Sequence, residues 1–185
     1  MYTSVKKISR RNSPKAYSAA LRDRNISHKQ VMTCVEGKRW EEEVLFCQHT
    51  NKDTITYYIR TKNWPKNVDA ARKQEIPEPG TRVRFYIELA PIVRTCGKEK
   101  ILKGDERDKW ASAKLTSAGL DVTEIKCHQV EAFMRRTENG RTRKQIPLYA
   151  CSGFAYVRDR AALHRALENG IGRYKSFGAG MLMIL

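Results

Sequence analysis

The sequence GIGRYKSFGAGMLMIL occupies residues 170–185 and joins a predicted amphipathic helix to an apolar strand. It contains four glycines and two cations: Gly170, Gly172, Gly178, Gly180, Arg173 and Lys175. Glycine adopts positive φ readily and allows another backbone to approach closely, while the two cations can bind phosphates. The P-loop and the dinucleotide-binding loop run in the opposite order, from strand through glycines to helix. The stretch therefore favours binding of a nucleic-acid backbone over binding of a mononucleotide.

The whole chain carries a large excess of positive charge. Among its 185 residues, 36 are Lys or Arg and 20 are Asp or Glu, which gives a formal net charge of +16. Such an excess favours a polyanionic partner, most economically a nucleic acid, although a ribosomal-type protein would be equally basic. No apolar stretch has the length of a transmembrane helix, and the first residues lack the apolar region of a signal peptide. We therefore expect a cytoplasmic protein.

The cysteines and carboxylates indicate neither a disulfide framework nor a metal site. The five cysteines are odd in number and include no CxxC pair. They are expected to be reduced thiols, as in most cytoplasmic proteins. No HExxH or DxD-type cluster is present, which argues against two-metal nuclease chemistry. We expect no metal and no cofactor.

The second half of the chain shows the clearest pattern of elements. Apolar residues alternate with polar ones in the first strand, helical spacing marks two helices, and Asn139-Gly140 is a strong hairpin-turn signal. The predicted elements are strands over 83–89, 123–136 and 143–157, helices over 108–118 and 162–167, and the apolar strand at the C-terminus. This β-α-β-β-α-β order is that of the ferredoxin-like fold.

The first half shows the same order with a faint last strand. The predicted elements are a strand over 2–9, a helical region from Ser13-Pro14, a helix capped by Ser27, strands over 44–49 and 54–61, and a short helix over 69–73. The Pro/Gly cluster at 77–80 marks a boundary. We therefore predict an α+β protein of two tandem ferredoxin-like domains, 1–79 and 80–185.

His28 is the candidate catalytic residue among the four histidines. With Ser27 as the N-cap, His28 lies in the first helical turn, where the positive helix end favours the neutral imidazole as a proton acceptor. Arg22, Arg24 and Lys29 surround it in sequence, as a phosphate-handling site requires. The remaining histidines are expected to be ordinary surface or structural side chains: His49, His128 and His164.

Two further groups of cations are candidate RNA ligands. The first follows the strand over 83–89 and consists of Arg94, Lys98 and Lys100, although a solvated basic loop explains it about equally well. The second flanks the Asn139-Gly140 turn and consists of Arg135, Arg136, Arg141, Arg143 and Lys144. A surface hairpin usually mixes charges, whereas here five cations accompany a single acid, Glu138. This imbalance favours an RNA-binding hairpin.

The stretch 170–185 resembles the carboxyl-terminal signature GIGxxKxxGxGLLxL of the RAMP superfamily of CRISPR proteins. Within that superfamily it is most similar to the CasE family, the repeat-cleaving endoribonucleases of type I-E Cascade complexes. The glycines, Lys175 and the apolar strand fall in register with the signature. The resemblance extends over nearly the whole chain and implies tandem ferredoxin-like (βαββαβ) domains of the RAMP type.

The resemblance also implies an activity. CasE-like proteins carry a catalytic histidine at the start of the first helix, and His28 occupies that place, followed by Lys29. Many relatives have a tyrosine three residues earlier, where this chain has Asn25, and Tyr17 is the nearest alternative. In one continuous helix Tyr17 and His28 would lie roughly 16 Å apart, so their cooperation requires the chain to fold back between them.

The implied reaction is metal-independent cleavage of CRISPR precursor RNA beside the repeat stem-loop. The RNA 2′-hydroxyl attacks the phosphate, which leaves a 2′,3′-cyclic phosphate and a 5′-hydroxyl. The basic hairpin would engage the stem-loop, and the protein would then stay on the mature crRNA with backbone RAMP proteins in a Cascade-like complex. The alternative is a non-catalytic RNA-binding RAMP subunit that keeps the hairpin and the glycine-rich stretch without turnover.

Overall fold

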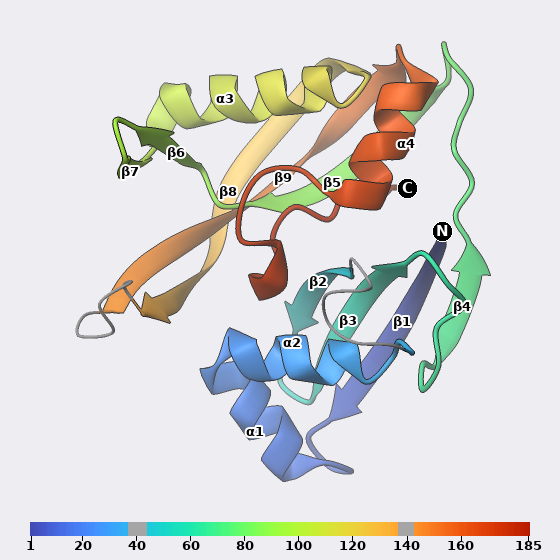
Figure 1. The fold of residues 1–185 in the computed structure, drawn as a ribbon, viewed down its shortest axis with the longest axis vertical. Coiled ribbons are helices and arrows are strands. Elements are labelled where there is room, and N and C mark those ends of the chain that lie inside the picture. The colour runs from blue at the N-terminus through green and yellow to red at the C-terminus, as the bar shows by residue number, and fades with distance from the viewer. Residues whose placement is uncertain (37–43, 137–142) are drawn as a thin grey trace. The chain divides into compact units, whose positions relative to one another are not determined.

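The computed structural model describes residues 1–36, 44–136 and 143–185, with the backbone alone at 134–136 and 143–144 (Figure 1). These residues form two compact units. Unit 1 comprises Met1–Glu75 and Tyr174–Met181, and unit 2 comprises Ile76–Arg173 and Leu182–Leu185. The sequence-based division into 1–79 and 80–185 differs from this one in two respects. The units divide a few residues earlier, and Tyr174–Met181, the returning segment, joins unit 1.

Unit 1 contains a four-stranded antiparallel sheet in the order β2-β3-β1-β4 (Figure 1). Its elements are β1 (Tyr2–Ser9), α1 (Pro14–Arg22), α2 (Arg24–Met32), β2 (Leu45–Thr50), β3 (Thr54–Thr61), β4 (Ala70–Lys73) and the 3₁₀ helix η1 (Lys175–Phe177). The strand order is that of a ferredoxin-like unit, with the first strand between the third and the fourth. The predicted strands over 2–9 and 54–61 are confirmed, and that over 44–49 is shifted by one residue.

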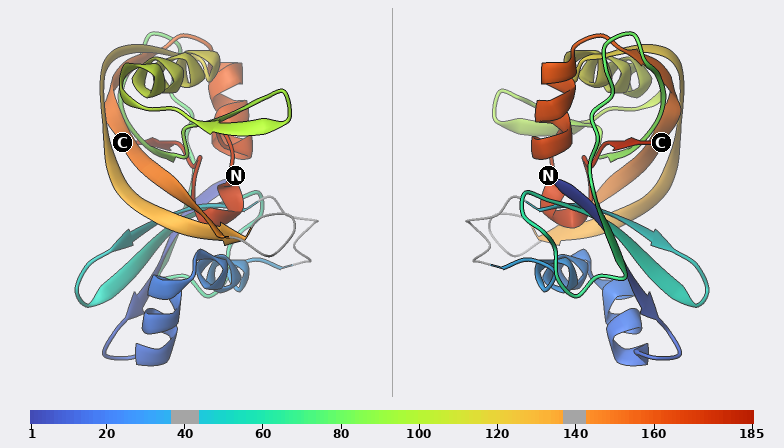
Figure 2. Two further views of the ribbon diagram at one scale, coloured as in Figure 1. Left: turned by 90° about the vertical axis from the view of Figure 1, so that its left-hand side faces the viewer. Right: turned by 90° about the vertical axis from the view of Figure 1, so that its right-hand side faces the viewer.

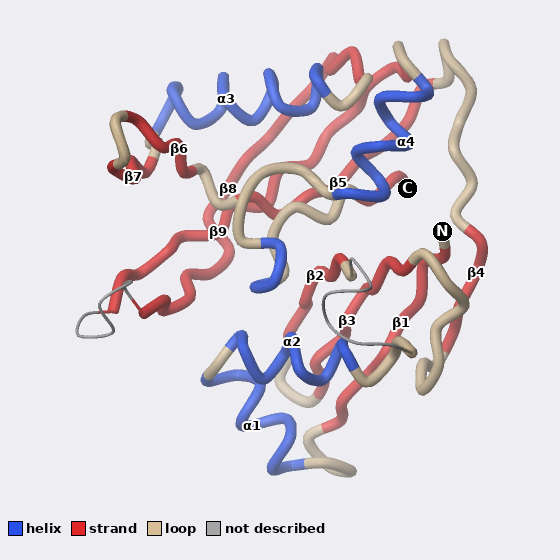
Figure 3. The backbone as a smooth tube through the Cα atoms, in the orientation of Figure 1, coloured by secondary structure: helices blue, strands red, loops and turns tan. Residues whose placement is uncertain are grey.

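The short helix predicted over 69–73 is wrong, because Ala70–Lys73 is the edge strand β4 (Figure 3). Its residues pair antiparallel with β1 from Tyr2↔Lys73 to Val5↔Ala70. The Asp69 carboxylate accepts a hydrogen bond of 2.6 Å from the Lys7 backbone N–H and fixes the entry to the strand. Four residues form few helical hydrogen bonds, whereas an edge strand gains ladder bonds to an existing sheet.

The predicted cap at Ser27 is also wrong, since α2 begins at Arg24 with Asp23 as its N-cap. Asp23 is extended, with φ −145°, and its side chain accepts a hydrogen bond of 2.8 Å from the Asn25 N–H. This residue breaks the helical region into α1 and α2. Ser27 is completely buried within α2, and its hydroxyl donates to the Ala20 carbonyl of α1 at 3.3 Å. His28 therefore lies in the second turn of α2.

Unit 2 contains a second four-stranded antiparallel sheet, in the order β10-β5-β9-β8. Its elements are β5 (Arg82–Leu89), β6 (Ile92–Thr95), β7 (Lys98–Ile101), α3 (Gly104–Ser117), β8 (Leu120–Arg136), β9 (Arg143–Val157), α4 (Arg160–Asn169) and β10 (Met183–Ile184). The ferredoxin-like order is again present, with β6 and β7 as a separate two-stranded sheet inserted after β5. The predicted tandem fold is thus confirmed, except that no helix lies between β3 and β4 in the described residues of unit 1.

The strands β8 and β9 form one long curved ribbon (Figure 2). They pair from Leu120↔Val157 to Arg136↔Arg143, with two irregularities in register. Gly153 faces one of these irregularities, and a Cβ there would collide with the Glu124 carbonyl. The predicted turn at Asn139-Gly140 lies outside the described residues. Within the parts of the chain that are described, no helix is long and apolar enough to span a membrane.

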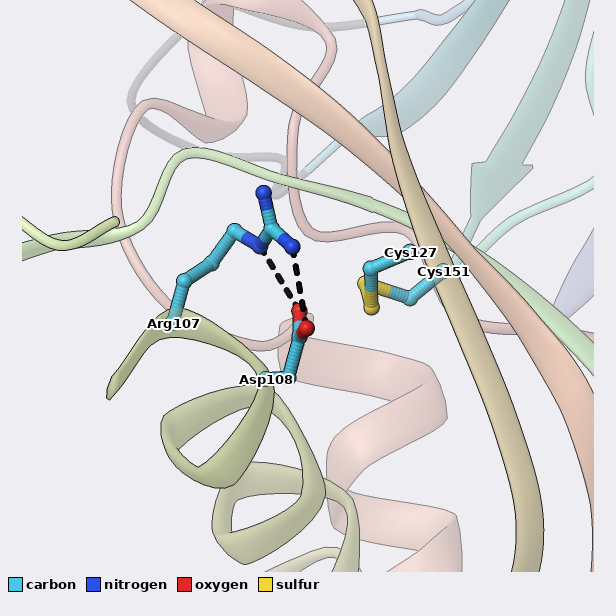
Figure 4. Close-up of a disulfide and its surroundings, with 4 residues drawn as sticks. All are labelled: Arg107, Asp108, Cys127 and Cys151. Carbon is cyan, nitrogen blue, oxygen red and sulfur yellow. Dashed lines mark hydrogen bonds and ion pairs between the residues drawn. A yellow bond between two sulfur atoms is a disulfide. The ribbon is translucent and has the colours of Figure 1, made fainter. Parts of the chain in front are cut away.

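The expectation that all five cysteines are reduced is wrong for Cys127 and Cys151, which form a disulfide (Figure 4). The register of β8 and β9 places the two residues directly opposite each other, with Cα atoms 4.2 Å apart. This separation is close to that of a non-hydrogen-bonded antiparallel pair. The sequence shows only that the two cysteines are 24 residues apart, and their register follows from the folded ribbon. The other three cysteines are thiols.

The disulfide lies near an ion pair at the start of α3 (Figure 4). The Arg107 guanidinium donates to the Asp108 carboxylate at 2.7 and 2.9 Å. It also stacks over the Tyr149 ring of β9, 4.4 Å from the ring centroid. The hydrogen bond to Asp108 raises the pKa of Arg107. Arg107 therefore links α3 to the sheet through its cation–π contact with Tyr149, while its ion pair with Asp108 lies within α3.

Replacing Cys127 and Cys151 together by alanine should lower the free energy of unfolding by about 2–4 kcal/mol, the usual contribution of a native disulfide. Urea unfolding without reductant measures the loss, and Cys96→Ala, which removes an exposed thiol, should be neutral. Under denaturing, non-reducing conditions, three of the five cysteines should react with a thiol reagent. Five reactive thiols together with a neutral double variant would contradict the disulfide.

Candidate active site

His28 differs from the other histidines in its surroundings. Its side chain is half-buried on α2, and both ring nitrogens are shielded from solvent. The imidazole packs against the Phe46 ring of β2, with centroids 6.2 Å apart and planes inclined by 38°. The remaining histidines are exposed: His49, His128 and His164. The contact with Phe46 restricts the orientation of the His28 ring.

The aromatic ring against which His28 packs is part of the core of unit 1. Phe46 contacts Tyr57 of β3 edge to face, with centroids 6.2 Å apart, and both side chains are completely buried. Burial raises the pKa of Tyr57, and the neighbouring Ser27 hydroxyl and the positive charge of Arg24 offset part of that effect. Tyr57 is therefore a neutral phenol at physiological pH. Its ring packs against Phe46, the residue that contacts His28.

The returning segment lies against the same Phe46 ring. Gly178 approaches Phe46 and Arg24 so closely that a Cβ on it would lie 3.0 Å from the ring and 3.1 Å from the guanidinium. All four glycines of the stretch have positive φ: Gly170 at 71°, Gly172 at 80°, Gly178 at 87° and Gly180 at 84°. The close approach and the left-handed backbone together explain why glycine occupies position 178. Lys175, in η1, thereby belongs to the same unit as His28.

The cations predicted around His28 have different environments. Arg22 and Lys29 are exposed. Arg24 is only 5% exposed, one helical turn before His28, and its guanidinium lies between α2 and Gly178. Arg22 and Lys29 are thus accessible to a phosphate. The burial of Arg24 instead suits a role in holding the returning segment against α2.

Tyr17 lies on α1, before the break at Asp23. The chain folds back between Tyr17 and His28, as their cooperation would require. The Tyr17 hydroxyl, however, donates to the backbone carbonyls of Asn51 at 2.8 Å and Lys52 at 3.1 Å. Its side chain is 6% exposed. These contacts anchor the turn between β2 and β3 to α1, which is a structural role.

The cations over 94–100 lie on the inserted β6–β7 hairpin. Its turn, Cys96-Gly97, has positive φ at both residues. Arg94, Lys98 and Lys100 are exposed there. Acidic residues that were not predicted as partners bind two cations of this region. Lys100 pairs with Glu106 at 2.8 Å, and Arg173 pairs with Glu99 at 3.5 Å, so the start of the glycine-rich stretch is tied to β7.

The cations near the end of the β8–β9 ribbon face one another in the backbone register. In the antiparallel ladder, Arg135 is opposite Lys144 and Arg136 is opposite Arg143. Like charges directly opposite each other destabilise a sheet, and a bound polyanion would relieve that repulsion. Arg141 lies outside the described residues. The backbone register thus brings four cationic residues to this end of the ribbon.

The fold is similar to those of several solved CRISPR-associated proteins. The CRISPR endoribonuclease Cse3 bound to a 19-nucleotide RNA has a TM-score of 0.85 at 20% identity, with both chains fully covered. Thermus thermophilus Cse3, bound to an RNA representing a pre-cleavage complex, has a TM-score of 0.82 at 19% identity, again with both chains fully covered. Cas6e from Escherichia coli K-12 has a TM-score of 0.75 at 18% identity, covering 100% of this chain and 98% of the other. The likeness shows that the chain has the tandem ferredoxin-like fold of these structures.

The family follows from the sequence itself. The model of the CRISPR-associated protein family matches residues 1–185, the whole chain. The chain belongs to this family. No curated protein is significantly similar to it in sequence. The resemblance inferred from the glycine-rich stretch is therefore confirmed at the level of family and fold.

Replacing Gly178 by alanine should destabilise the protein more than replacing Gly80 by alanine. Both glycines have left-handed backbones, with φ of +87° and +83°, but a Cβ at Gly80 meets no atom within 4 Å. The added contacts of Gly178→Ala with Phe46 and Arg24 correspond to overpacking, which costs about 1–3 kcal/mol. Denaturant unfolding of the two variants measures the difference. Equal losses would contradict the close approach at Gly178.

Proposed function

We propose that this protein is a metal-independent endoribonuclease that cleaves CRISPR precursor RNA beside the repeat stem-loop. The observation that carries the proposal is the placement of His28. It is half-buried, whereas the other three histidines are exposed, and it packs on Phe46, which the returning segment also contacts. Family membership and the likeness to solved endoribonucleases support the same function.

The proposed reaction uses the RNA's own nucleophile. The 2′-hydroxyl attacks the adjacent phosphorus, its proton is removed, and the bond to the leaving 5′-oxygen breaks as that oxygen is protonated. His28 performs one of these two proton transfers. The products are a 2′,3′-cyclic phosphate and a 5′-hydroxyl. Cations stabilise the extra negative charge on the phosphorane, and Lys29 and Lys175 are the candidates in the same unit.

Unit 2 would supply most of the RNA-binding surface. The β8–β9 ribbon end and the exposed cations of the β6–β7 hairpin fit the phosphates of an RNA stem, whose narrow major groove favours reading of shape and backbone. Surface ion pairs such as Lys100–Glu106 contribute little stability, so their cations are available to exchange for phosphates. The proposed partners are the repeat stem-loop, the mature crRNA and backbone RAMP proteins of a Cascade-like complex in the cytoplasm.

A second candidate function is a non-catalytic RNA-binding RAMP subunit. The observation in its favour concerns the tyrosine that many relatives use. Asn25, which stands in its place, donates through its side chain to the Asp23 carboxylate at 2.9 Å and so supports the helix cap. Tyr17 is occupied by the β2–β3 turn. Turnover of the repeat RNA separates the two functions.

His28→Ala should lower the cleavage rate of bound repeat RNA by ~10²-fold or more, as expected for loss of a general acid or base. Affinity for the stem-loop should change little, because His28 is half-buried and the cations remain. His49→Ala, His128→Ala and His164→Ala are matched controls with exposed side chains. Single-turnover cleavage with saturating protein measures the rates. A control variant slower than His28→Ala would show that the site is assigned wrongly.

Cleavage should persist in EDTA and should stop when the 2′-hydroxyl at the cut site is replaced by hydrogen. The reason is that the attacking oxygen comes from the RNA and the protons move through a side chain. Product analysis should find a cyclic phosphate on the upstream fragment. Cleavage of the 2′-deoxy substrate, or a strict need for added divalent metal in the chemical step, would refute the mechanism. Tight binding without any cleavage of the natural substrate would favour the non-catalytic subunit.

A further inference from the structure

Trp64 is an exposed aromatic residue that the proposed function does not use. It lies in the segment after β3, and 64% of it is accessible to solvent. Its ring meets the Tyr2 ring of β1 edge to face, with centroids 5.2 Å apart and planes inclined by 73°. Large aromatic side chains normally bury most of their surface, so this exposure leaves a large apolar ring surface accessible.

The backbone around Trp64 is held in place on both sides. The Thr61 hydroxyl donates to the Asn63 carbonyl at 2.7 Å, just before the tryptophan. The Lys66 N–H donates to the Cys34 carbonyl at 2.8 Å, and Pro65 between them is buried. A ligand that stacks on Trp64 therefore meets a segment that is already ordered. Little conformational entropy is lost on binding.

Cations surround the two rings. Lys62 and Lys66 flank Trp64 in sequence, and both are exposed. Lys73 of β4 is directly opposite Tyr2 in the antiparallel pairing, so its side chain emerges on the same face of the sheet as the Tyr2 ring. Lys66 pairs with Glu36 at 3.4 Å, but both groups are largely in water and the pair is readily exchanged. The local charge thus favours a polyanion beside the aromatic rings.

We propose that Trp64 and Tyr2 form a stacking site for an unpaired base in a single-stranded RNA segment attached to the repeat stem-loop. Lys62 and Lys73 bind the phosphates next to that base. Exposed aromatic rings interleaved with cations are the usual means of binding single-stranded RNA without sequence preference. The proposal rests on the proposed function, because it assumes that the protein binds repeat RNA. It adds a second site for the RNA that continues beyond the stem.

The experiment compares three RNAs: the repeat stem-loop alone, the stem-loop with a single-stranded oligouridine extension at either end, and the oligouridine alone. Base stacking on an aromatic ring accounts for about a 5- to 100-fold difference in affinity on alanine substitution. Trp64→Ala should weaken binding of an extended RNA, and of the oligouridine, by a factor in this range. Trp64→Phe should restore most of the affinity. Binding of the bare stem-loop should stay unchanged in both variants.

Crosslinking to the unaltered protein tests the site without any substitution. An extension that carries 4-thiouridine should crosslink to the peptide that contains Trp64 or to the one that contains Tyr2. Failure of all stem-loop binding, with oligouridine binding intact and sensitive to Trp64→Ala, would overturn the proposed function and leave the stacking site supported. Equal affinities of wild type and Trp64→Ala for the extended RNA, without crosslinks to these peptides, would overturn the stacking site. If RNA affinity is unchanged but Trp64→Ala binds purified RAMP proteins more weakly than wild type does, the surface formed by Trp64 and Tyr2 belongs to a protein partner and the stacking site is overturned.

Discussion

The packing around the candidate site depends on the absence of a side chain at Gly178. Because no Cβ is present, the returning segment can lie against Phe46 and the Arg24 guanidinium with a left-handed backbone. Phe46 in turn supports the His28 ring, and Tyr57 supports Phe46. This contact covers Arg24 and accompanies the placement of Lys175 in the same unit as His28. A stretch that reads as a phosphate loop in the sequence thus also packs in the interior.

The charge distribution explains why a nucleic acid suits this protein. A formal charge of +16 on 185 residues repels itself, and the β8–β9 register places cations opposite cations near the ribbon end. The structure relieves part of this repulsion locally, as in the pairs of Arg173 with Glu99 and Lys100 with Glu106. Among these, Glu99 is mostly buried by its surroundings, with 15% of its side chain exposed. The remaining cations can bind the phosphates of a nucleic acid.

The sequence predicted the elements that depend on local patterns and missed those that depend on register. Alternation of apolar and polar residues predicted the strand over 83–89, and the helical spacing of the apolar residues near 162–167 located α4. The edge strand β4 is too short to show a pattern of its own, and its conformation comes from pairing with β1. The start of α2 was missed because Asp23 and Ser27 are both good caps, and only the packing of Ser27 against α1 decides between them. The disulfide likewise depends on which residues of β8 and β9 face each other. This register cannot be deduced from the spacing of the cysteines in the sequence.

The return of residues 174–181 to unit 1 has a consequence for how the protein is made. The first unit lacks its last segment until the whole of the second unit's main span, Ile76–Arg173, has been synthesised. At roughly 5–20 residues per second, a nascent chain waits for several seconds with the surface of Phe46 uncovered. Such long-range closure slows folding, because distant parts of the chain must meet before the contact contributes any stability. Translation itself therefore imposes a delay between the appearance of His28 and the completion of its surroundings, so an unfinished chain carries the histidine without the loop that packs beside it.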